Sequence, residues 1–183
     1  MTTGAARGAI RLVLFDVDGV LTDGSLHIGD SGEHAKVFNV RDGIAIGLLR
    51  THGIKTGVMS GKASGPLDFR IRQLGFDASV TGRLDKLPAY VQMLAELGVR
   101  DEEVAYVGDD VVDLAVMRRV GVSYAPADAH ALVLQQATHV LQARGGQGVA
   151  REVAEHVLMA AGLTLEQVYA HMLEADWHKA YVQ

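Results

Sequence analysis

The chain has 183 residues, of which 49% are hydrophobic and 21% charged, a balance typical of an ordinary globular protein. Its formal net charge is −5, which argues against the basic surface of a nucleic-acid-binding protein. The sequence contains no cysteine, so disulfide frameworks, thiolate metal sites and cysteine nucleophiles are excluded. This composition fits a protein of a reducing compartment, and we expect it to be cytoplasmic.

The sequence pattern divides the chain into a leader, one domain and a tail. Residues 1–9 lack the apolar segment of a signal peptide, so we expect a disordered leader, and no apolar run approaches the ~20 residues that span a bilayer. Residues 10–162 carry the periodic patterns of a single domain. Residues 163–183 predict a helix that starts at the capping residue Thr164, followed by an aromatic tail with Trp177. The tail could pack on a neighbouring subunit or on its own domain.

Short apolar runs of strand length alternate with segments of helical periodicity along the domain. The expected strands are Ile10–Phe15, Ile54–Met59, Ala78–Val80, Val104–Val107, Val122–Tyr124 and His139–Leu141. The expected helices are Gly43–Arg50, Leu67–Leu74, Lys86–Leu97, Val111–Arg119, Ala129–Gln136 and Val149–Ala160. This alternation predicts an α/β fold with a Rossmann-like, doubly wound parallel sheet and helices on both faces.

A turn-rich interval, residues 25–38, follows the first predicted strand. Two short extended runs flank the turn residues 29–32, which predicts an inserted β-hairpin. Its apolar side chains either form an exposed ribbon or fold back on the parent sheet; they are Leu26, Ile28, Val37 and Phe38. Because an isolated hairpin is marginally stable in water, we expect this one to associate with copies of itself unless it folds back.

Acidic residues follow two of the predicted strands, at the sheet edge where open α/β sheets bind ligands. Asp16 and Asp18 follow the first strand on one side of an extended segment, and Asp109, Asp110 and Asp113 follow the fourth. For any one of them alone, a helix N-cap is the simpler interpretation. Together they would repel one another without a divalent cation, and Mg²⁺ is commonly held by one or two carboxylates with waters and phosphate oxygens. The joint pattern therefore predicts a Mg²⁺ site.

Groups able to bind a phosphate lie in the same predicted region. Ser60 and Gly61 follow the second strand, and Lys86 opens the helix after the third. A hydroxyl, backbone N–H groups and an ammonium suit the peripheral oxygens of a phosphate. Helix capping alone does not readily explain the order of these groups along the chain, which is two carboxylates, a hydroxyl, a lysine and a second acidic group. We therefore interpret the set as a catalytic site.

The same residues resemble the four motifs of the haloacid dehalogenase (HAD) superfamily. The matching positions, in the order of the superfamily, are Asp16-Val17-Asp18-Gly19-Val20, Ser60, Lys86 and Gly108-Asp109-Asp110-Val111-Val112-Asp113. Longer strings resemble more narrowly the 3-deoxy-D-manno-octulosonate 8-phosphate (KDO 8-phosphate) phosphatases; they are residues 16–24, 38–43, 106–110, 127–130 and 145–152. The resemblance covers residues 10–160, which is nearly the whole predicted domain.

The resemblance implies a phosphatase of lipopolysaccharide (KDO) biosynthesis that hydrolyses KDO 8-phosphate through an aspartyl-phosphate. Asp16 would be the nucleophile, and Asp18 would protonate the departing alcohol and then activate water. Mg²⁺ would bind the Asp16 carboxylate, the Asp18 backbone carbonyl and the Asp109 carboxylate. Both the nucleophile and the acid therefore come from the loop that follows the first strand.

The remaining motif residues have supporting roles in this resemblance. Lys86 would act in catalysis and, with Ser60 and Gly61, bind the phosphate. Asp110 and Asp113 would orient the ligands or Lys86, although an N-cap role is the alternative for either.

Three basic residues, Arg41, Lys62 and Arg70, are candidates for binding the substrate. Members of the family commonly carry Arg at the Lys62 position, and Arg or His where this chain has Gln147. Related phosphatases of sialic-acid-like nonulosonate 9-phosphates, the alternative substrates, tend to place an acidic residue at the Lys62 position. The retained positive charge therefore favours the KDO-type keto-acid sugar, whereas solvated surface charge is the alternative role for Arg41 and Arg70.

No cap domain fits into the chain, because only the hairpin follows the first motif and one helix and one strand fill residues 60–86. The resemblance implies a capless subfamily that forms homotetramers, in which a neighbouring subunit completes the active site. A different class of protein, a non-catalytic HAD-like oligomerisation module, is also possible. The presence of Asp16, Asp18 and Lys86 argues against that alternative.

Overall fold

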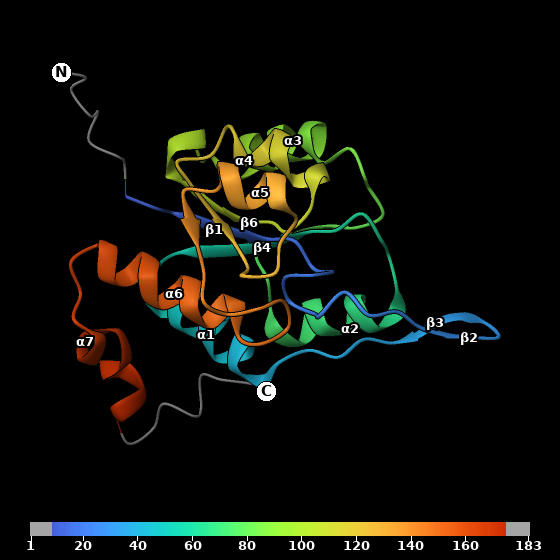
Figure 1. The fold of residues 1–183 in the computed structure, drawn as a ribbon. Helices are drawn as coiled ribbons and strands as arrows, with labels where there is room; N and C mark the ends of the chain where they lie inside the picture. Colours follow the sequence, from blue (N-terminus) through green and yellow to red (C-terminus); the bar gives the residue numbers. More distant parts are fainter. Residues whose placement is uncertain (1–8, 175–183) are drawn as a thin grey trace.

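The computed structural model describes residues 9–174; residues 1–8 of the predicted leader and residues 175–183 of the predicted tail lie outside the described part. Six strands form one sheet in the order β5-β4-β1-β6-β7-β8, and every pair in it is parallel (Figure 1). The strands are β1 Leu12–Phe15, β4 Lys55–Met59, β5 Ala78–Val80, β6 Val104–Val107, β7 Val122–Ala125 and β8 His139–Val140. The predicted α/β fold with a parallel sheet is confirmed.

Helices cover both faces of the sheet (Figure 1). One layer holds α1 Val40–Thr51, α2 Gly65–Leu74 and α6 Val149–Ala160; the other holds α3 Lys86–Leu97, α4 Leu114–Met117 and α5 Ala131–Gln136. The central strand β1 serves both layers, since Val13 and Phe15 belong to one apolar core and Leu12 and Leu14 to the other. A sheet buried on both faces needs near-continuous apolar strands, which is the pattern that the sequence shows.

Two predicted helices are shorter and less regular than their periodicity indicates. The segment expected to be one helix over 111–119 begins with the 3-10 turn η2 Val111–Asp113 and continues as α4. The last predicted helix consists of α7 Leu165–Tyr169 and the 3-10 turn η3 Ala170–Leu173. A further 3-10 turn, η1 Asp101–Glu103, precedes β6. None of the helices in residues 9–174 combines the length and apolarity needed to cross a membrane.

The inserted hairpin consists of β2 His27–Gly29 and β3 Gly32–Ala35, which pair antiparallel with each other and form a separate sheet. It projects from the body of the domain beside α2 (Figure 1). Leu26 is 48% exposed and Ile28 is 62% exposed, whereas Phe38 packs partly against the main core. Val37, which follows β3, is 63% exposed as well, so in the described chain the hairpin presents Leu26, Ile28 and Val37 to solvent and only Phe38 packs on the domain.

Candidate active site

The carboxyl ends of β1, β4 and β6 meet at one edge of the sheet. Phe15 at the end of β1 lies in register with Val58 of β4 and Val107 of β6. The residues that follow these strands are therefore neighbours, and they include Asp16 and Ser60. This adjacency follows from parallel strands in register and needs no long-range loop.

A buried lysine links the two acidic segments. Lys86, the first residue of α3, is 2% exposed, and its Nζ lies 2.6 Å from Asp16 Oδ1 and 2.6 Å from Asp113 Oδ1. Burial would lower the pKa of Lys86, but the two carboxylates outweigh this effect and the pKa is raised. Lys86 is thus held as a cation beside Asp16.

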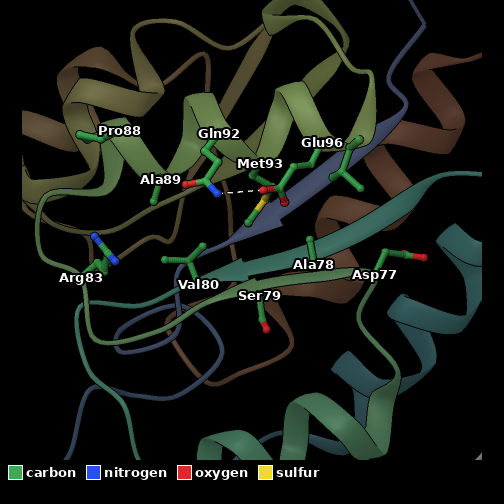
Figure 2. Close-up of a pocket in the computed structure, with 11 residues that line it drawn as sticks. Asp77, Ala78, Ser79, Val80, Arg83, Pro88, Ala89, Gln92, Met93 and Glu96 are labelled. Carbon is green, nitrogen blue, oxygen red and sulfur yellow. Dashed lines mark hydrogen bonds between the residues drawn. The ribbon is translucent and has the colours of Figure 1, made fainter.

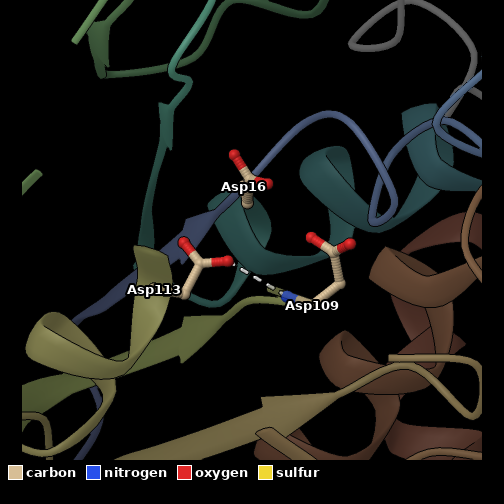
Figure 3. Close-up of side chains that lie close together, drawn as sticks. All are labelled: Asp16, Asp109 and Asp113. Atoms are coloured by element: carbon tan, nitrogen blue, oxygen red, sulfur yellow. Dashed lines mark hydrogen bonds between the residues drawn. The ribbon is translucent and has the colours of Figure 1, made fainter. Parts of the chain in front are cut away.

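Asp113 uses both of its carboxylate oxygens inside the protein. Oδ1 accepts hydrogen bonds from Lys86 Nζ and from the Tyr106 hydroxyl at 2.7 Å. Oδ2 accepts the backbone N–H groups of Asp109 at 3.1 Å and Asp110 at 3.3 Å, the first of which is drawn in Figure 3. With four donors around it, Asp113 holds neighbouring groups in place and offers no free oxygen. Tyr106 belongs to the string 106–110 that resembles the family, but the sequence did not predict that its hydroxyl would bind Asp113.

Asp110 has the capping geometry that the sequence left open as an alternative. Its carboxylate accepts the backbone N–H of Val111 at 2.7 Å, and it is the N-cap of η2. Asp113 completes this cap because it lies three residues further and accepts the Asp110 N–H. Asp113 therefore combines the cap with its contact to Lys86.

The chemistry of the cluster fits a divalent cation. Asp16, Asp109 and Asp113 each offer an oxygen within 4.8 Å of the others (Figure 3). Asp109 Oδ1 is buried without a hydrogen-bond partner. Burial, with the charges of Asp16 and Asp113, raises the pKa of Asp109 to about 8. Burial also raises the pKa of Asp16 to about 6, although Lys86 opposes the shift. Since the oxygens of Asp113 are already bonded, Asp16 and Asp109 are the carboxylates with capacity left for Mg²⁺.

Two glycines let the loop after β1 lie close against its surroundings. Gly19 has φ +93°, and a Cβ there would lie 2.1 Å from Asp109 Oδ2. Gly145 packs against the same loop, where a Cβ would lie 2.3 Å from the carbonyl oxygen of Gly19. Any side chain at either position would displace the loop that carries Asp16 and Asp18.

Asp18 lies on the same loop and contacts a residue that the sequence analysis missed. Its Oδ1 forms an ion pair with Lys36 Nζ and lies 3.4 Å from Thr22 Oγ1. Lys36 follows β3 directly, and its Nζ also lies 3.0 Å from Glu33 Oε1. A single lysine in a turn-rich hairpin looks like a solvent-exposed residue, so no sequence signal marks its burial.

The predicted phosphate donors lie at the end of β4. Ser60 is 1% exposed, and its Oγ accepts the backbone N–H of Lys62 at 3.1 Å, which holds the loop in a tight turn. Gly61 faces Leu84, since a Cβ at this glycine would lie 2.8 Å from Leu84 Cδ2. The side chain of Leu84 is exposed beside this turn.

The three predicted substrate residues do not contact the acidic cluster. Arg70 lies 5.7 Å from the centre of the Phe38 ring, and its Nη2 donates to the Asn39 carbonyl at 3.4 Å. It lines a hollow of about 430 Å³ that Lys36 also lines. Arg41 and Lys62 are exposed side chains. The role of these three residues in substrate binding therefore stays a prediction.

A second hollow, of about 400 Å³, lies between β5 and α3 (Figure 2). Val80, Arg83 and Gln92 are among the residues that line it. None of the predicted site residues lines this hollow. It is therefore separate from the acidic cluster.

Comparison with known proteins gives the chain a family. Residues 79–153 match the family model described as haloacid dehalogenase-like hydrolase. The 3-deoxy-D-manno-octulosonate 8-phosphate phosphatase of Yersinia pestis is 45% identical over 151 residues, which are 82% of this chain and 81% of the relative. This chain belongs to the KDO 8-phosphate phosphatase family. The phosphatase of Escherichia coli strain K12, another member, is 42% identical over 153 residues, covering 84% of this chain and 81% of that protein.

Solved structures of KDO 8-phosphate phosphatases share the fold. The cobalt-bound form from Haemophilus influenzae has a TM-score of 0.82 and 43% identity, covering 84% of this chain and 90% of that chain. The structure from Moraxella catarrhalis, in complex with magnesium ion, phosphate ion and KDO, has a TM-score of 0.80 and 33% identity, covering 83% of this chain and 87% of that chain. Both structures hold a divalent metal, the type of ion that the acidic cluster of this family member fits.

Proposed function

We propose that this chain is a Mg²⁺-dependent phosphatase that hydrolyses KDO 8-phosphate to KDO and inorganic phosphate. The observation that carries the proposal is the arrangement around Asp16: a carboxylate at the end of a central strand, fixed by Lys86 and close to the unpartnered oxygen of Asp109. Family membership at 45% identity supports the substrate. A structural module without catalysis would have no need for a buried lysine and three carboxylates in one place.

The first step is phosphoryl transfer to Asp16. The Oδ2 of Asp16 attacks phosphorus, the bond from phosphorus to the sugar oxygen breaks, and Asp18 gives its proton to that oxygen. The products are an aspartyl-phosphate on Asp16, the free sugar and an ionised Asp18. Lys86 stays bonded to Asp16 Oδ1 at 2.6 Å, which keeps the attacking oxygen oriented.

The second step returns the enzyme to its starting state. Asp18 takes a proton from a water molecule, which attacks phosphorus and releases inorganic phosphate from Asp16. The proton taken from water restores the acid form of Asp18 for the next turnover. Ser60 and Gly61, at the end of β4, bind peripheral phosphate oxygens in both steps, together with Lys86.

The metal would be held by this chain's own oxygens. We expect the Asp16 and Asp109 carboxylates and the Asp18 backbone carbonyl to bind it, since Asp113 is already fully bonded. When bound, Mg²⁺ supplies positive charge that screens the phosphate and the two carboxylates from one another. Asp110 and Asp113 keep their capping and orienting roles around this site.

The far end of the substrate would meet the outer basic residues. A KDO-type acid carries a carboxylate, and we assign its recognition to Arg41, Lys62 and Arg70. Lys62 is a point charge without the planar fork of arginine, so it binds a carboxylate through single hydrogen bonds. Arg70 is the most constrained of the three because it stacks on Phe38 and donates to the Asn39 carbonyl.

We also propose that a neighbouring subunit covers the active site in a homotetramer. Between Asp18 and α1 the chain adds only the β2–β3 hairpin, and between Ser60 and Lys86 it adds only α2 and β5. Neither insertion supplies a domain that could exclude water. The exposed Leu26 and Ile28 of the hairpin give an apolar surface for self-association, and closed symmetry favours a finite assembly.

A phosphate-release screen tests the substrate. The purified protein is given KDO 8-phosphate, a sialic-acid-type 9-phosphate and simple hexose phosphates, each with Mg²⁺. We expect kcat/KM for KDO 8-phosphate to exceed that for the others by about tenfold or more, the effect of one well-placed charged contact. A higher kcat/KM for the 9-phosphate would reassign the substrate, and no release from any ester would favour the non-catalytic module.

A further inference from the structure

Lys36 is a buried cation whose ammonium group contacts Asp18, in the active-site loop that follows β1. It follows β3 directly, yet its side chain is 0% exposed and its Nζ lies between the carboxylates of Asp18 and Glu33. An ammonium group is costly to bury unless carboxylates surround it, so its two partners account for its position. Lys36 lies 18 positions after Asp18 in the chain, so this contact depends on how the base of the hairpin folds back.

The two oxygens of Asp18 have different surroundings. Oδ1 is the oxygen that contacts Lys36 and lies 3.4 Å from Thr22 Oγ1. Within residues 9–174, Oδ2 has no hydrogen-bond donor. An Oδ1 held by Lys36 can act as an acceptor whether the carboxyl group is protonated or ionised, provided that the proton is on Oδ2. The anchor therefore persists through both steps of the proposed reaction.

We propose that Lys36 is a positioning residue that fixes Asp18 Oδ1 and thereby leaves Oδ2 to move the proton. This inference rests on the proposed function, in which Asp18 is the acid and base. In the first step the proton passes from Oδ2 to the sugar oxygen as the bond from that oxygen to phosphorus breaks. In the second step Oδ2 takes a proton from the attacking water. Lys36 neither gains nor loses a proton in either step.

A simple structural role is the rival explanation, since Lys36 also ties the hairpin to the domain. The two roles differ in their dependence on the leaving group. An alcohol that leaves as a stable anion, such as 4-nitrophenol, needs no proton from Asp18, whereas phenol and a sugar alcohol do. A merely structural loss would slow all these esters alike.

The experiment compares kcat/KM of wild type and Lys36→Met for 4-nitrophenyl phosphate, phenyl phosphate and KDO 8-phosphate. We expect a fall of about 30-fold for phenyl phosphate and the sugar phosphate, which is part of the 10²–10⁴-fold that a general acid supplies, and of no more than about threefold for 4-nitrophenyl phosphate. An equal fall for all three esters, or no fall, would overturn the inference. If wild type hydrolyses the small esters but not KDO 8-phosphate, the proposed substrate is wrong and the comparison of the two small esters still tests Lys36.

Three further variants serve as controls for this test. Lys36→Met leaves Glu33 as a buried unpaired charge, so the double variant Glu33→Gln/Lys36→Met is the version to use if the single variant unfolds. Lys55→Met, at the opposite end of the sheet in β4, is the control for loss of a lysine and should leave the ratio between the two small esters unchanged.

A double variant tests whether Lys36 acts through Asp18. Adding Lys36→Met to Asp18→Asn should not slow the hydrolysis of phenyl phosphate further if it does. A further multiplicative loss in that double variant would contradict the inference.

Discussion

The ammonium group of Lys86 lies 2.6 Å from Oδ1 of Asp113, and both side chains are buried. The same nitrogen lies 2.6 Å from Asp16 Oδ1, so Asp113 sets where the lysine meets the proposed nucleophile. Asp113 also accepts the Tyr106 hydroxyl and two backbone N–H groups. One carboxylate thereby connects the end of β6, the start of α3 and the loop after β1.

Asp113→Asn should destabilise the fold and lower turnover together. The amide keeps the shape but removes the charge that compensates the buried Lys86, and loss of one partner of a buried pair costs about 3–5 kcal/mol of unfolding free energy. Chemical denaturation and phosphate release measure the two effects. Asp110→Asn is the matched control, because Asn and Asp are equally good N-caps and we expect little change. Equal stability of the two variants would contradict the assigned role of Asp113.

Removal of the metal should inactivate the enzyme. We expect EDTA to abolish phosphate release and Mg²⁺ to restore it. Asp109→Ala should raise the Mg²⁺ concentration for half-maximal activity by about tenfold or more, because it removes a carboxylate with an unpartnered oxygen. Asp110→Ala, which removes the neighbouring carboxylate, should leave that concentration nearly unchanged. Full activity in the chelator would exclude the metal-dependent mechanism.

Charges on the hairpin should dissociate the proposed tetramer. Leu26→Glu, just before β2, and Ile28→Glu, within β2, put a carboxylate on the exposed apolar surface of the hairpin, and a charge buried in an interface is strongly unfavourable. Light scattering should report smaller particles, and kcat/KM for KDO 8-phosphate should fall more than that for 4-nitrophenyl phosphate, which does not need the lid for recognition. Met159→Glu, at the same 48% exposure as Leu26 but on α6, is the control. An active wild-type monomer would show that no neighbour supplies the lid.

Asp42 of α1 should make stability depend on pH. It is buried, and its Oδ1 accepts the backbone N–H of Ala150 at 3.1 Å near the start of α6. Burial raises its pKa from the ordinary 3.8 to about 7, so between these values the folded protein keeps a proton that the unfolded chain releases. Wild type should therefore lose stability relative to Asp42→Asn as pH rises from about 4 to about 7, by up to about 1.4 kcal/mol per pH unit, and the loss should level off above pH 7 as the folded protein also releases the proton. Denaturation at pH 5, 6, 7 and 8 measures this, and a difference that does not change with pH would contradict it.

The sheet and the grouping of Asp16, Lys86 and Asp113 could be predicted from the sequence for a physical reason. Strands buried on both faces leave short apolar runs, and β5 and β6 have the predicted bounds. In a parallel sheet, residues that follow neighbouring strands must meet, which is why Asp16, Lys86 and Asp113 could be grouped from their positions in the chain.

Contacts that depend on how loops and turns bend could not be predicted from the sequence. Periodicity over residues 111–119 predicted one helix, but the Asp113 carboxylate binds the backbone N–H groups just before it and a 3-10 turn forms there. Lys36 was missed because only the path of the hairpin base brings it to Asp18. Asp42 lies in a string that resembles the family, yet its contact with Ala150 depends on the packing of α1 against α6.

The most direct test of the account is phosphate release from KDO 8-phosphate by wild type and by Asp16→Asn, each with Mg²⁺ and with EDTA. The amide preserves the shape of the side chain and removes the nucleophile, and circular dichroism should show the fold of wild type. We expect wild type to release phosphate only with Mg²⁺, and Asp16→Asn to keep less than about a hundredth of the wild-type kcat, since loss of covalent catalysis costs several kcal/mol. An inactive wild type, or an Asp16→Asn variant above that level, would contradict the proposed mechanism.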